Sequence, residues 1–206
     1  MKVVVLSDTH GNFYNIDMPE GDILIVAGDW SAQGGMYACI TFNKWLNVQP
    51  FKHKLYIPGN HELGFEQNPS LENLITAGIN INKKLITIEG INFFGYSYTL
   101  PFNNWAFAKN ENLQEYYFKT IAPEKVDILV THGPPYGILD GGYEENNLGS
   151  KALLEYVKEI EPKLHVFGHI HEGYGINKTA MPNTTFANVS LVDTLAIINK
   201  PMVFKI

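Results

Sequence analysis

Five short apolar runs constrain the possible folds of this chain more than any other sequence feature. A polar loop that contains glycine follows each run. The runs are residues 3–6, 23–26, 55–57, 128–130 and 165–167. Short runs that are rich in β-branched residues are typical of strands buried on both faces of a sheet. Because the loops at the carboxyl ends of parallel strands converge on one edge of the sheet, five segments far apart in sequence are expected to meet in space.

Helical patterns lie between these runs. Apolar residues recur with helical spacing between residues 39 and 46 and again between residues 153 and 160. Ser150 is a suitable N-cap for the second of these helices, and Pro162 follows its expected end. A shorter helix is predicted for residues 70–74. Helices therefore alternate with strands over much of the chain.

Other segments indicate antiparallel pairing. Residues 85–88 and 91–94 are separated only by Glu89-Gly90, which predicts a hairpin. The tail contains three further strand-like pieces, residues 184–187, 195–198 and 203–206. Strands of both kinds, with helices outside them, predict an α/β fold (α+β by some schemes): two stacked mixed β-sheets flanked by helices, a four-layer αββα sandwich. We expect residues 1–206 to form a single domain of this kind.

Composition narrows the possible functions. The net charge is −6, and all 15 basic residues are lysines. A nucleic-acid clamp is disfavoured, because phosphate backbones are bound by dense basic surfaces. The single cysteine, Cys39, excludes an intrachain disulfide and fits a reducing compartment. No apolar run approaches the roughly 20 residues of a membrane span. The apolar segment at the start of the chain is too short for the hydrophobic region of a signal sequence. We therefore expect a soluble cytoplasmic protein without membrane partners.

The polar clusters after the five runs contain nearly all of the unusual residues. They are Asp8-Thr9-His10-Gly11, Gly28-Asp29, Gly59-Asn60-His61-Glu62, Thr131-His132-Gly133 and Gly168-His169-Ile170-His171. Their carboxylate, amide and imidazole groups suit divalent Mn, Fe, Co, Ni or Zn, and no thiolate is nearby. Because side chains alternate along an extended segment, Asp-x-His and His-x-His are expected to place two donors on one side. Two ions bridged by one carboxylate, such as that of Asp29, would clamp a phosphate and compensate for the missing arginine.

The order of these clusters strongly resembles that of the calcineurin-like metallophosphoesterase superfamily, whose pattern is D-x-H, G-D, G-N-H-[DE], H and G-H-x-H. The resemblance runs from residue 3 to about residue 175. Residues 22–29, 131–140 and 167–175 look like one branch in particular, the metallophosphoesterase-domain-containing proteins. That branch is similar to the class III cyclic-nucleotide phosphodiesterases.

The resemblance implies a role for each cluster residue. One metal would be held by Asp8, His10, Asp29 and His171, and the second by Asp29, Asn60, His132 and His169. Asp29 would bridge both ions, together with a hydroxide that attacks phosphorus in line. His61 would not be a ligand but would protonate the leaving oxygen, so that His61 and Asp29 are the expected catalytic residues. Glu62 would support the loop, and manganese is the first choice of metal among the ions named above.

Three functions remain open at this point. The first is a dinuclear metal-dependent hydrolase of small organic phosphodiesters, with cyclic nucleotides among the candidates. The second is a phosphomonoesterase acting on nucleotides or sugar phosphates, and the third is an inactive scaffold of the same fold. Related protein phosphatases and dinucleoside polyphosphatases carry arginine after the second motif, where this chain has Trp30. Those two substrate classes are therefore disfavoured, and the oligomeric state is not predicted.

Several residues near the clusters allow two interpretations. The aromatic-rich stretch 95–107 would either form a wall for a substrate ring or close a small core. Tyr136 and Tyr174 have the same two alternatives. His53 and His165 lie outside the five clusters, at or within predicted strands, and we expect them to be structural.

Overall fold

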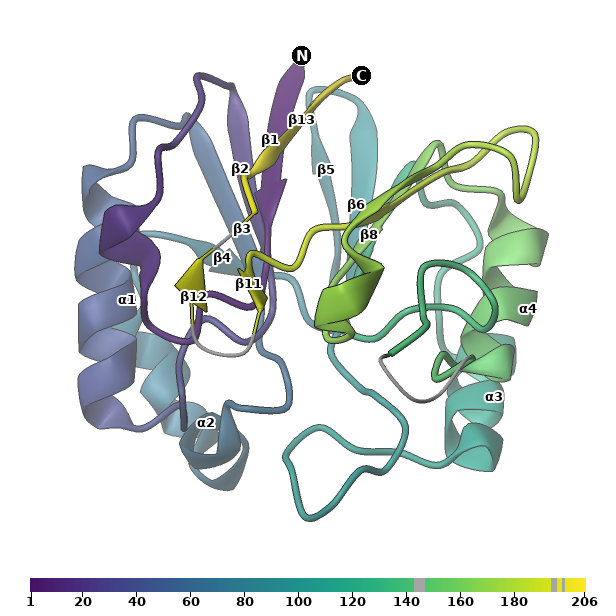
Figure 1. Ribbon diagram of the computed structural model, residues 1–206, viewed down its shortest axis with the longest axis horizontal. Coiled ribbons are helices and arrows are strands. Elements are labelled where there is room, and N and C mark those ends of the chain that lie inside the picture. The colour runs from purple at the N-terminus through teal and green to yellow at the C-terminus, as the bar shows by residue number, and fades with distance from the viewer. Residues whose placement is uncertain (143–146, 194–195, 198) are drawn as a thin grey trace.

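The computed structural model describes residues 1–142, 147–193, 196–197 and 199–206. Within these residues, two mixed β-sheets stack against each other, and helices cover both outer faces (Figure 1). Helices α1 (Met36–Val48) and α2 (Leu63–Gln67) lie on one flank, and α3 (Glu111–Thr120) and α4 (Lys151–Ile160) lie on the other. The predicted four-layer αββα sandwich is confirmed.

The first sheet has the strand order β13-β1-β2-β3-β4. These strands are β13 (Met202–Lys205), β1 (Lys2–Leu6), β2 (Ile23–Ala27), β3 (His53–Ile57) and β4 (Ile79–Asn80). All neighbours are parallel except β13, which pairs antiparallel with β1. The three apolar runs in this half of the chain are therefore strands, as predicted, and they run side by side in the same direction.

The second sheet has the order β5-β6-β7-β8-β10-β9. Its strands are β5 (Leu85–Ile88), β6 (Ile91–Tyr96), β7 (Ile128–Thr131), β8 (Leu164–Phe167), β10 (Thr185–Asn188) and β9 (Gly175–Asn177). The four central strands are parallel, and the two outermost strands pair antiparallel with their neighbours. The hairpin predicted at Glu89-Gly90 is present. Both turn residues have positive φ, 51° and 82°, as a type I′ turn requires.

The tail follows the prediction with small shifts. The predicted pieces 184–187 and 203–206 correspond to β10 and β13. Of the piece predicted at 195–198, Ala196–Ile197 forms β12 and pairs antiparallel with β11 (Val192–Asp193), whereas residues 195 and 198 lie outside the described residues.

Both predicted long helices are present. The Ser150 hydroxyl accepts a hydrogen bond from the Leu153 N–H and caps α4, as expected. The helix predicted at 70–74 is instead a 3₁₀ helix, Pro69–Leu74, with proline at its first position. Helices α2 and α3 were not predicted. In α3 the buried positions are Gln114 and Phe118, so a polar residue interrupts the apolar stripe.

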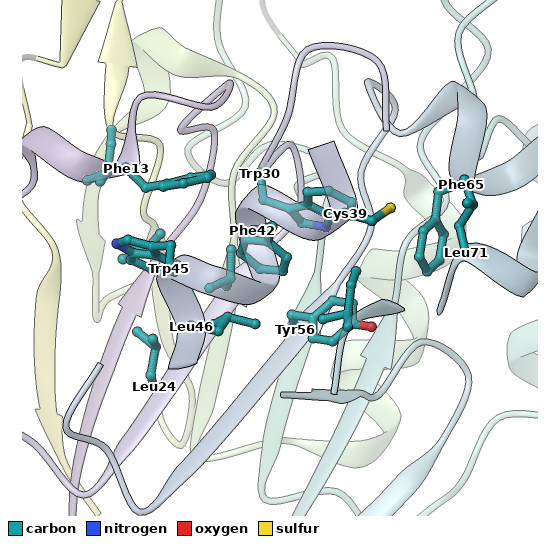
Figure 2. Close-up of a cluster of buried hydrophobic side chains, with 14 of the residues drawn as sticks. Phe13, Leu24, Trp30, Cys39, Phe42, Trp45, Leu46, Tyr56, Phe65 and Leu71 are labelled. Atoms are coloured by element: carbon teal, nitrogen blue, oxygen red, sulfur yellow. The ribbon is translucent and has the colours of Figure 1, made fainter. Parts of the chain in front are cut away.

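Three layers of apolar side chains hold the sheets and helices together. The middle layer lies between the sheets and includes Val5, Ile25 and Val130. One outer layer packs α1 and α2 on the first sheet (Figure 2), and the other packs α3 and α4 on the second. In the layer of Figure 2, Trp30 stacks on Phe42 with ring centroids 4.5 Å apart. Burial of Trp30 fixes the chain directly after Asp29.

The fold separates the chain ends from the carboxyl ends of the parallel strands. Both termini lie together at one edge of the sandwich, and β1 runs from there toward the opposite edge (Figure 1). At that opposite edge Ser7 forms a bridge with Ser190, which joins the two sheets. Among the residues that the structure describes, no helix combines the length and hydropathy that crossing a membrane would require.

Candidate metal centre

The five predicted clusters meet at the carboxyl edge of the two sheets. They do so through tight turns and not through extended segments. Asp8, His10, Asp29 and His169 all have positive φ, between 45° and 70°. Such backbone is uncommon for residues other than glycine and concentrates at functional sites. The expectation that Asp-x-His and His-x-His are extended is therefore wrong, because left-handed residues turn each segment toward the site.

Asp8, His10 and His171 form one group of potential metal ligands. The His171 Nε2 atom lies 3.5 Å from Asp8 Oδ1 and 3.4 Å from His10 Nε2. One donor atom of each residue lies within 4.8 Å of the others, close enough for a single ion to contact all three. Asp8 is completely buried, and the two histidines are partly exposed at the surface.

The other oxygen of Asp8 is held by groups that sequence reasoning missed. The Ser190 hydroxyl donates to Asp8 Oδ2 at 2.7 Å, and the Ser7 hydroxyl donates to the same oxygen. The backbone N–H of His169 adds a third hydrogen bond at 3.1 Å. Ser7 directly precedes its cluster and could have been singled out, whereas Ser190 lies beyond the resembling segment. The His169 N–H also lies 3.3 Å from Oδ1, the oxygen that faces His171.

Asp29, Asn60 and His132 form a second, deeper group. The His132 Nε2 atom lies 2.9 Å from Asn60 Oδ1 and 3.3 Å from Asp29 Oδ1. The His132 Nδ1 atom faces the Ala27 carbonyl at 2.9 Å, so Nδ1 carries the proton and Nε2 is directed at the site. The ring of His169 lies beside that of His132, with centroids 5.2 Å apart.

Asp29 lies between the two groups. It shares one potential ligand group with Asp8 and His132 and another with His10 and His61. Its Oδ1 atom also accepts a hydrogen bond from the His61 backbone N–H at 2.8 Å. Asp29 therefore adjoins histidines of both groups, and Asp8, which lies near His132 as well as His10 and His171, is its carboxylate neighbour.

His61 is oriented by contacts on two sides. Its Nδ1 atom faces the Ala32 carbonyl at 3.2 Å, which assigns the proton to Nδ1. Its Nε2 atom lies 4.0 Å from Asp29 Oδ2. One ring face stacks on Trp105, with centroids 4.1 Å apart and planes at 26°, and His10 packs edge-on at 4.5 Å. The Nε2 atom of His61 therefore faces the centre of the site.

Glu62 holds the loops of two clusters together. Its buried carboxylate accepts hydrogen bonds from the backbone N–H groups of Asp29, Ser31 and Gly59 at 3.0, 2.9 and 2.6 Å, and from the Ser31 hydroxyl at 2.8 Å. Burial and the neighbouring Asp29 raise the pKa of Glu62, and these donors oppose that rise. The expected supporting role agrees with this geometry.

Two glycines allow the potential ligands to approach the backbone. A Cβ atom at Gly28 would collide with the His132 ring, and one at Gly168 would collide with the Asp8 carboxylate and the Ser7 hydroxyl. Gly28 also has φ of 98°, which side-chain-bearing residues rarely adopt. Gly28 and Gly168 are thus required by the crowding of the site.

Electrostatics favour ionised carboxylates at the centre. Burial raises the pKa of Asp8 and of Asp29, but the surrounding histidines outweigh it. The main opposing contacts are the hydrogen bond with His171 for Asp8 and the charge of His132 for Asp29, and both carboxyls have pKa values below the ordinary range. Two ionised carboxylates are therefore buried among histidines, where a bound cation would balance their charge.

The surroundings of the histidines shift their pKa values in different directions. Burial lowers the pKa of His10, and burial together with the charge of His132 lowers that of His169 to about 4. Burial also acts to lower the pKa of His132, but the adjacent Asp29 raises it to about 9. His10 and His169 are thus neutral near pH 7, the form in which imidazole binds a metal, whereas a cation at His132 would displace a proton.

Two histidines and the aromatic-rich stretch 95–107 lie outside the set of potential metal ligands. His53 begins β3, and His165 is buried within β8, so both lie outside the site as expected. Within the stretch 95–107, Tyr96 and Phe107 are buried in the core. Leu100, Pro101 and Phe102 line a cavity beside His169, so this stretch closes part of the core and also borders a cavity.

The two tyrosines have contacts of their own. The Tyr174 hydroxyl donates to the Lys200 carbonyl at 2.9 Å, and the Lys151 ammonium lies over the Tyr136 ring at 4.9 Å. Neither contact involves a potential metal ligand. These contacts support a structural interpretation of both tyrosines.

Comparison with known proteins gives a consistent family. A family model described as "Calcineurin-like phosphoesterase" matches residues 1–173. The chain is 35% identical over 222 residues to "UPF0046 protein K07C11.7" of Caenorhabditis elegans, covering all of this chain and 75% of that protein. It is 36% identical over 218 residues to "Metallophosphoesterase domain-containing protein 1" of Homo sapiens, covering 92% of this chain and 66% of that protein. The chain therefore spans only part of the length of these relatives.

Two solved structures share the fold. One, with 15% identity, has a TM-score of 0.69 and covers 91% of this chain and 89% of its own. The other, TT1561 of Thermus thermophilus, has 13% identity and a TM-score of 0.63, and it covers 91% and 88%. At these identities the likeness shows the arrangement of sheets and helices alone.

Proposed function

Because the chain belongs to the calcineurin-like phosphoesterase family, we propose that it is a dinuclear metal-dependent hydrolase of small organic phosphodiesters. The family itself establishes metal-dependent phosphoric ester hydrolysis as the general chemistry. The proposal adds two ions, a preference for diesters and a role for each residue.

The observation that carries the proposal is the place of Asp29 between two groups of donors. Its carboxylate adjoins His132 on one side and His10 on the other. A carboxylate has two oxygens and can contact two ions at once. Two ions bound this way would neutralise the charge of a bound phosphate.

The residues present fit such a pair of ions. The proposal assigns one ion to Asp8, His10, Asp29 and His171, and the other to Asp29, Asn60, His132 and His169. Mixed oxygen and imidazole donors suit manganese, which we take as the native metal, and also iron, zinc, cobalt and nickel. When bound, the ions would supply the positive charge that this arginine-free chain lacks and would activate the attacking water.

His61 is assigned to the leaving group. Its ring is held by Ala32 and Trp105, and its Nε2 atom faces the site. A protonated Nε2 would donate a hydrogen bond to the ester oxygen and transfer its proton as that oxygen departs. An alternative assignment makes His61 a metal ligand, since His10, Asp29 and His61 also form a potential ligand group. Metal content after substitution of His61 separates the two.

We also propose that the protein works in a reducing compartment on a small-molecule substrate. The single cysteine, Cys39, is buried and free, which supports a reducing compartment such as the cytoplasm. The substrate is a small phosphoester and not a nucleic acid, which the net charge of −6 supports.

A metal-reconstituted activity screen tests the proposed function. The apoprotein is loaded separately with manganese, iron, zinc, cobalt or nickel and assayed with bis(p-nitrophenyl) phosphate and p-nitrophenyl phosphate. We expect turnover with at least one ion and a higher kcat/KM for the diester. Preference for the monoester would support the phosphomonoesterase alternative, and metal uptake without turnover of either ester would support a scaffold. The Asp29→Ala variant serves as the inactive control.

A further inference from the structure

A cavity of about 490 Å³ opens beside His169 and is not used by any role assigned above. We propose that this cavity binds the uncharged aromatic or apolar ester group of the substrate. The inference rests on the proposed function, because an ion at His169 would hold the phosphate at the mouth of the cavity. Its volume lies within the range of about 300–1,000 Å³ that is typical of small-molecule sites.

One wall comes from the loop after β6. Leu100, Pro101 and Phe102 line the cavity, and the side chain of Phe102 is 60% exposed, so it has few contacts of its own. The base of this loop is fixed by two backbone hydrogen bonds, from Thr99 N–H to the Phe107 carbonyl at 2.9 Å and from Lys109 N–H to the Thr99 carbonyl at 3.0 Å. An exposed aromatic residue therefore lines the cavity, on a loop whose base is anchored.

A second part of the lining comes from Asn147 and Leu148, in the segment that precedes α4. The buried carboxylate of Asp140 holds this segment, since Oδ2 accepts hydrogen bonds from the N–H groups of Gly149 at 3.0 Å and Gly137 at 2.7 Å. The Leu148 N–H also donates to the Asp140 carbonyl at 3.1 Å. This wall is thus tied to the loop that follows His132.

His169 and Ile170 complete the described lining. Ile170 is held by Asn188, whose amide donates to the Ile170 carbonyl at 2.7 Å and to the Leu139 carbonyl at 3.2 Å. A ligand in the cavity therefore lies directly next to a proposed metal ligand. The phosphate and its ester group can occupy the two sites together.

The described part of the lining suits an uncharged group. Among the described residues that line the cavity, none is a lysine or an acid, and five of the seven are apolar. A second charged phosphate or a carboxylate would lose its hydration there without gaining an ion pair. A planar ring would bury apolar surface and stack on Phe102. This apolar lining therefore favours esters with an aryl group or a nucleobase over sugar phosphates and polyphosphates.

Calorimetric titration of the manganese-loaded protein with three non-hydrolysed probes tests the proposal. The probes are inorganic phosphate, methylphosphonate and phenylphosphonate. We expect phenylphosphonate to bind about tenfold more tightly than methylphosphonate, since one stacked ring is worth about that factor. The Phe102→Ala variant should lose most of this preference while its Kd for phosphate stays unchanged. Leu148→Asn is a second variant with the same expected effect.

The matched control is Tyr37→Ala, which removes another exposed aromatic side chain, 82% exposed on α1, and should leave all three affinities unchanged. Equal binding of phenylphosphonate and methylphosphonate by the wild type would overturn the cavity proposal alone. A phenyl preference that persists in both cavity variants would also overturn it. Failure of the metal-loaded protein to bind any probe, phosphate included, would contradict the proposed function as well. Comparison of adenosine 5′-monophosphate with ribose 5-phosphate then shows whether a nucleobase occupies the cavity as an aryl ring does.

Discussion

Trp105 stacks on His61 with their ring centroids 4.1 Å apart and their planes at 26°. The contact joins the loop after β6 to the Gly-Asn-His-Glu cluster, and a backbone hydrogen bond from Ala106 N–H to the Asn60 carbonyl at 3.1 Å reinforces it. Of the two ring faces of His61, one is therefore fixed by a residue outside the proposed set of metal ligands. We infer that Trp105 positions His61.

Replacing Trp105 with alanine should lower kcat about 3- to 10-fold and leave metal content unchanged, because an aromatic contact is worth about 0.5–1.5 kcal/mol. Trp105→Phe should retain most of the activity. If His61 protonates the leaving oxygen, the loss should be larger for diesters with a more basic leaving group. In a His61→Ala background, Trp105→Ala should have no further effect on kcat. A full additive effect in that background would show that Trp105 acts independently of His61.

The His61→Ala variant should keep both ions and lose about 10²-fold or more in kcat, as expected for removal of a general acid. Metal analysis and steady-state kinetics on the same preparation measure the two quantities. His53→Ala, at the start of β3 and outside the site, is the matched control. Loss of metal along with activity would mean that His61 is a ligand.

The Glu62→Gln variant should bind metal about 10- to 100-fold more weakly, because the carboxylate that orients the Asp29 and Gly59 backbone is replaced by a group with one donor end. The free energy of unfolding should also fall, because the amide N–H group of the glutamine would face backbone N–H donors in a buried position. Metal titration against Glu115→Gln, an exposed ion-pair residue, checks this. Equal affinities in the two variants would remove Glu62 from the metal centre.

Burial lowers the pKa of His165 to about 3, well below its ordinary value. The unfolded chain binds a proton at this residue near pH 6.5 and the folded chain does not, so folding stability falls as the pH drops from about 6.5 toward 3. When the pH drops from 7 to 5, this residue should lower the free energy of unfolding by about 2 kcal/mol. Urea unfolding of wild type and His165→Gln at both values measures the difference. The same pH dependence in both proteins would refute the assignment.

The strands and the ligand clusters were predictable because their signals are local. A parallel strand buried on both faces must be an apolar run such as residues 23–26, and the polar residues that follow it must lie at the carboxyl edge. The register of the hairpin follows equally from Glu89-Gly90. These features need no knowledge of distant contacts.

The remaining features depend on distant contacts. Ser190 reaches Asp8 only because the segments that follow β10 and β1 lie side by side, and Trp105 reaches His61 only through an irregular loop. Neither contact leaves a periodic pattern in the sequence. Helix α3 has a recognisable N-cap, Asn110, but buried Gln114 breaks its apolar stripe and hides the helical period.

The central claim, that Asp29 bridges two ions, is tested most directly by anomalous diffraction from crystals grown with manganese. We predict two anomalous peaks per molecule, about 3.5–4 Å apart and both adjoining the Asp29 carboxylate, and the loss of both peaks in Asp29→Ala. A single peak, two peaks away from Asp29, or one fully occupied site remaining in the variant would contradict the account.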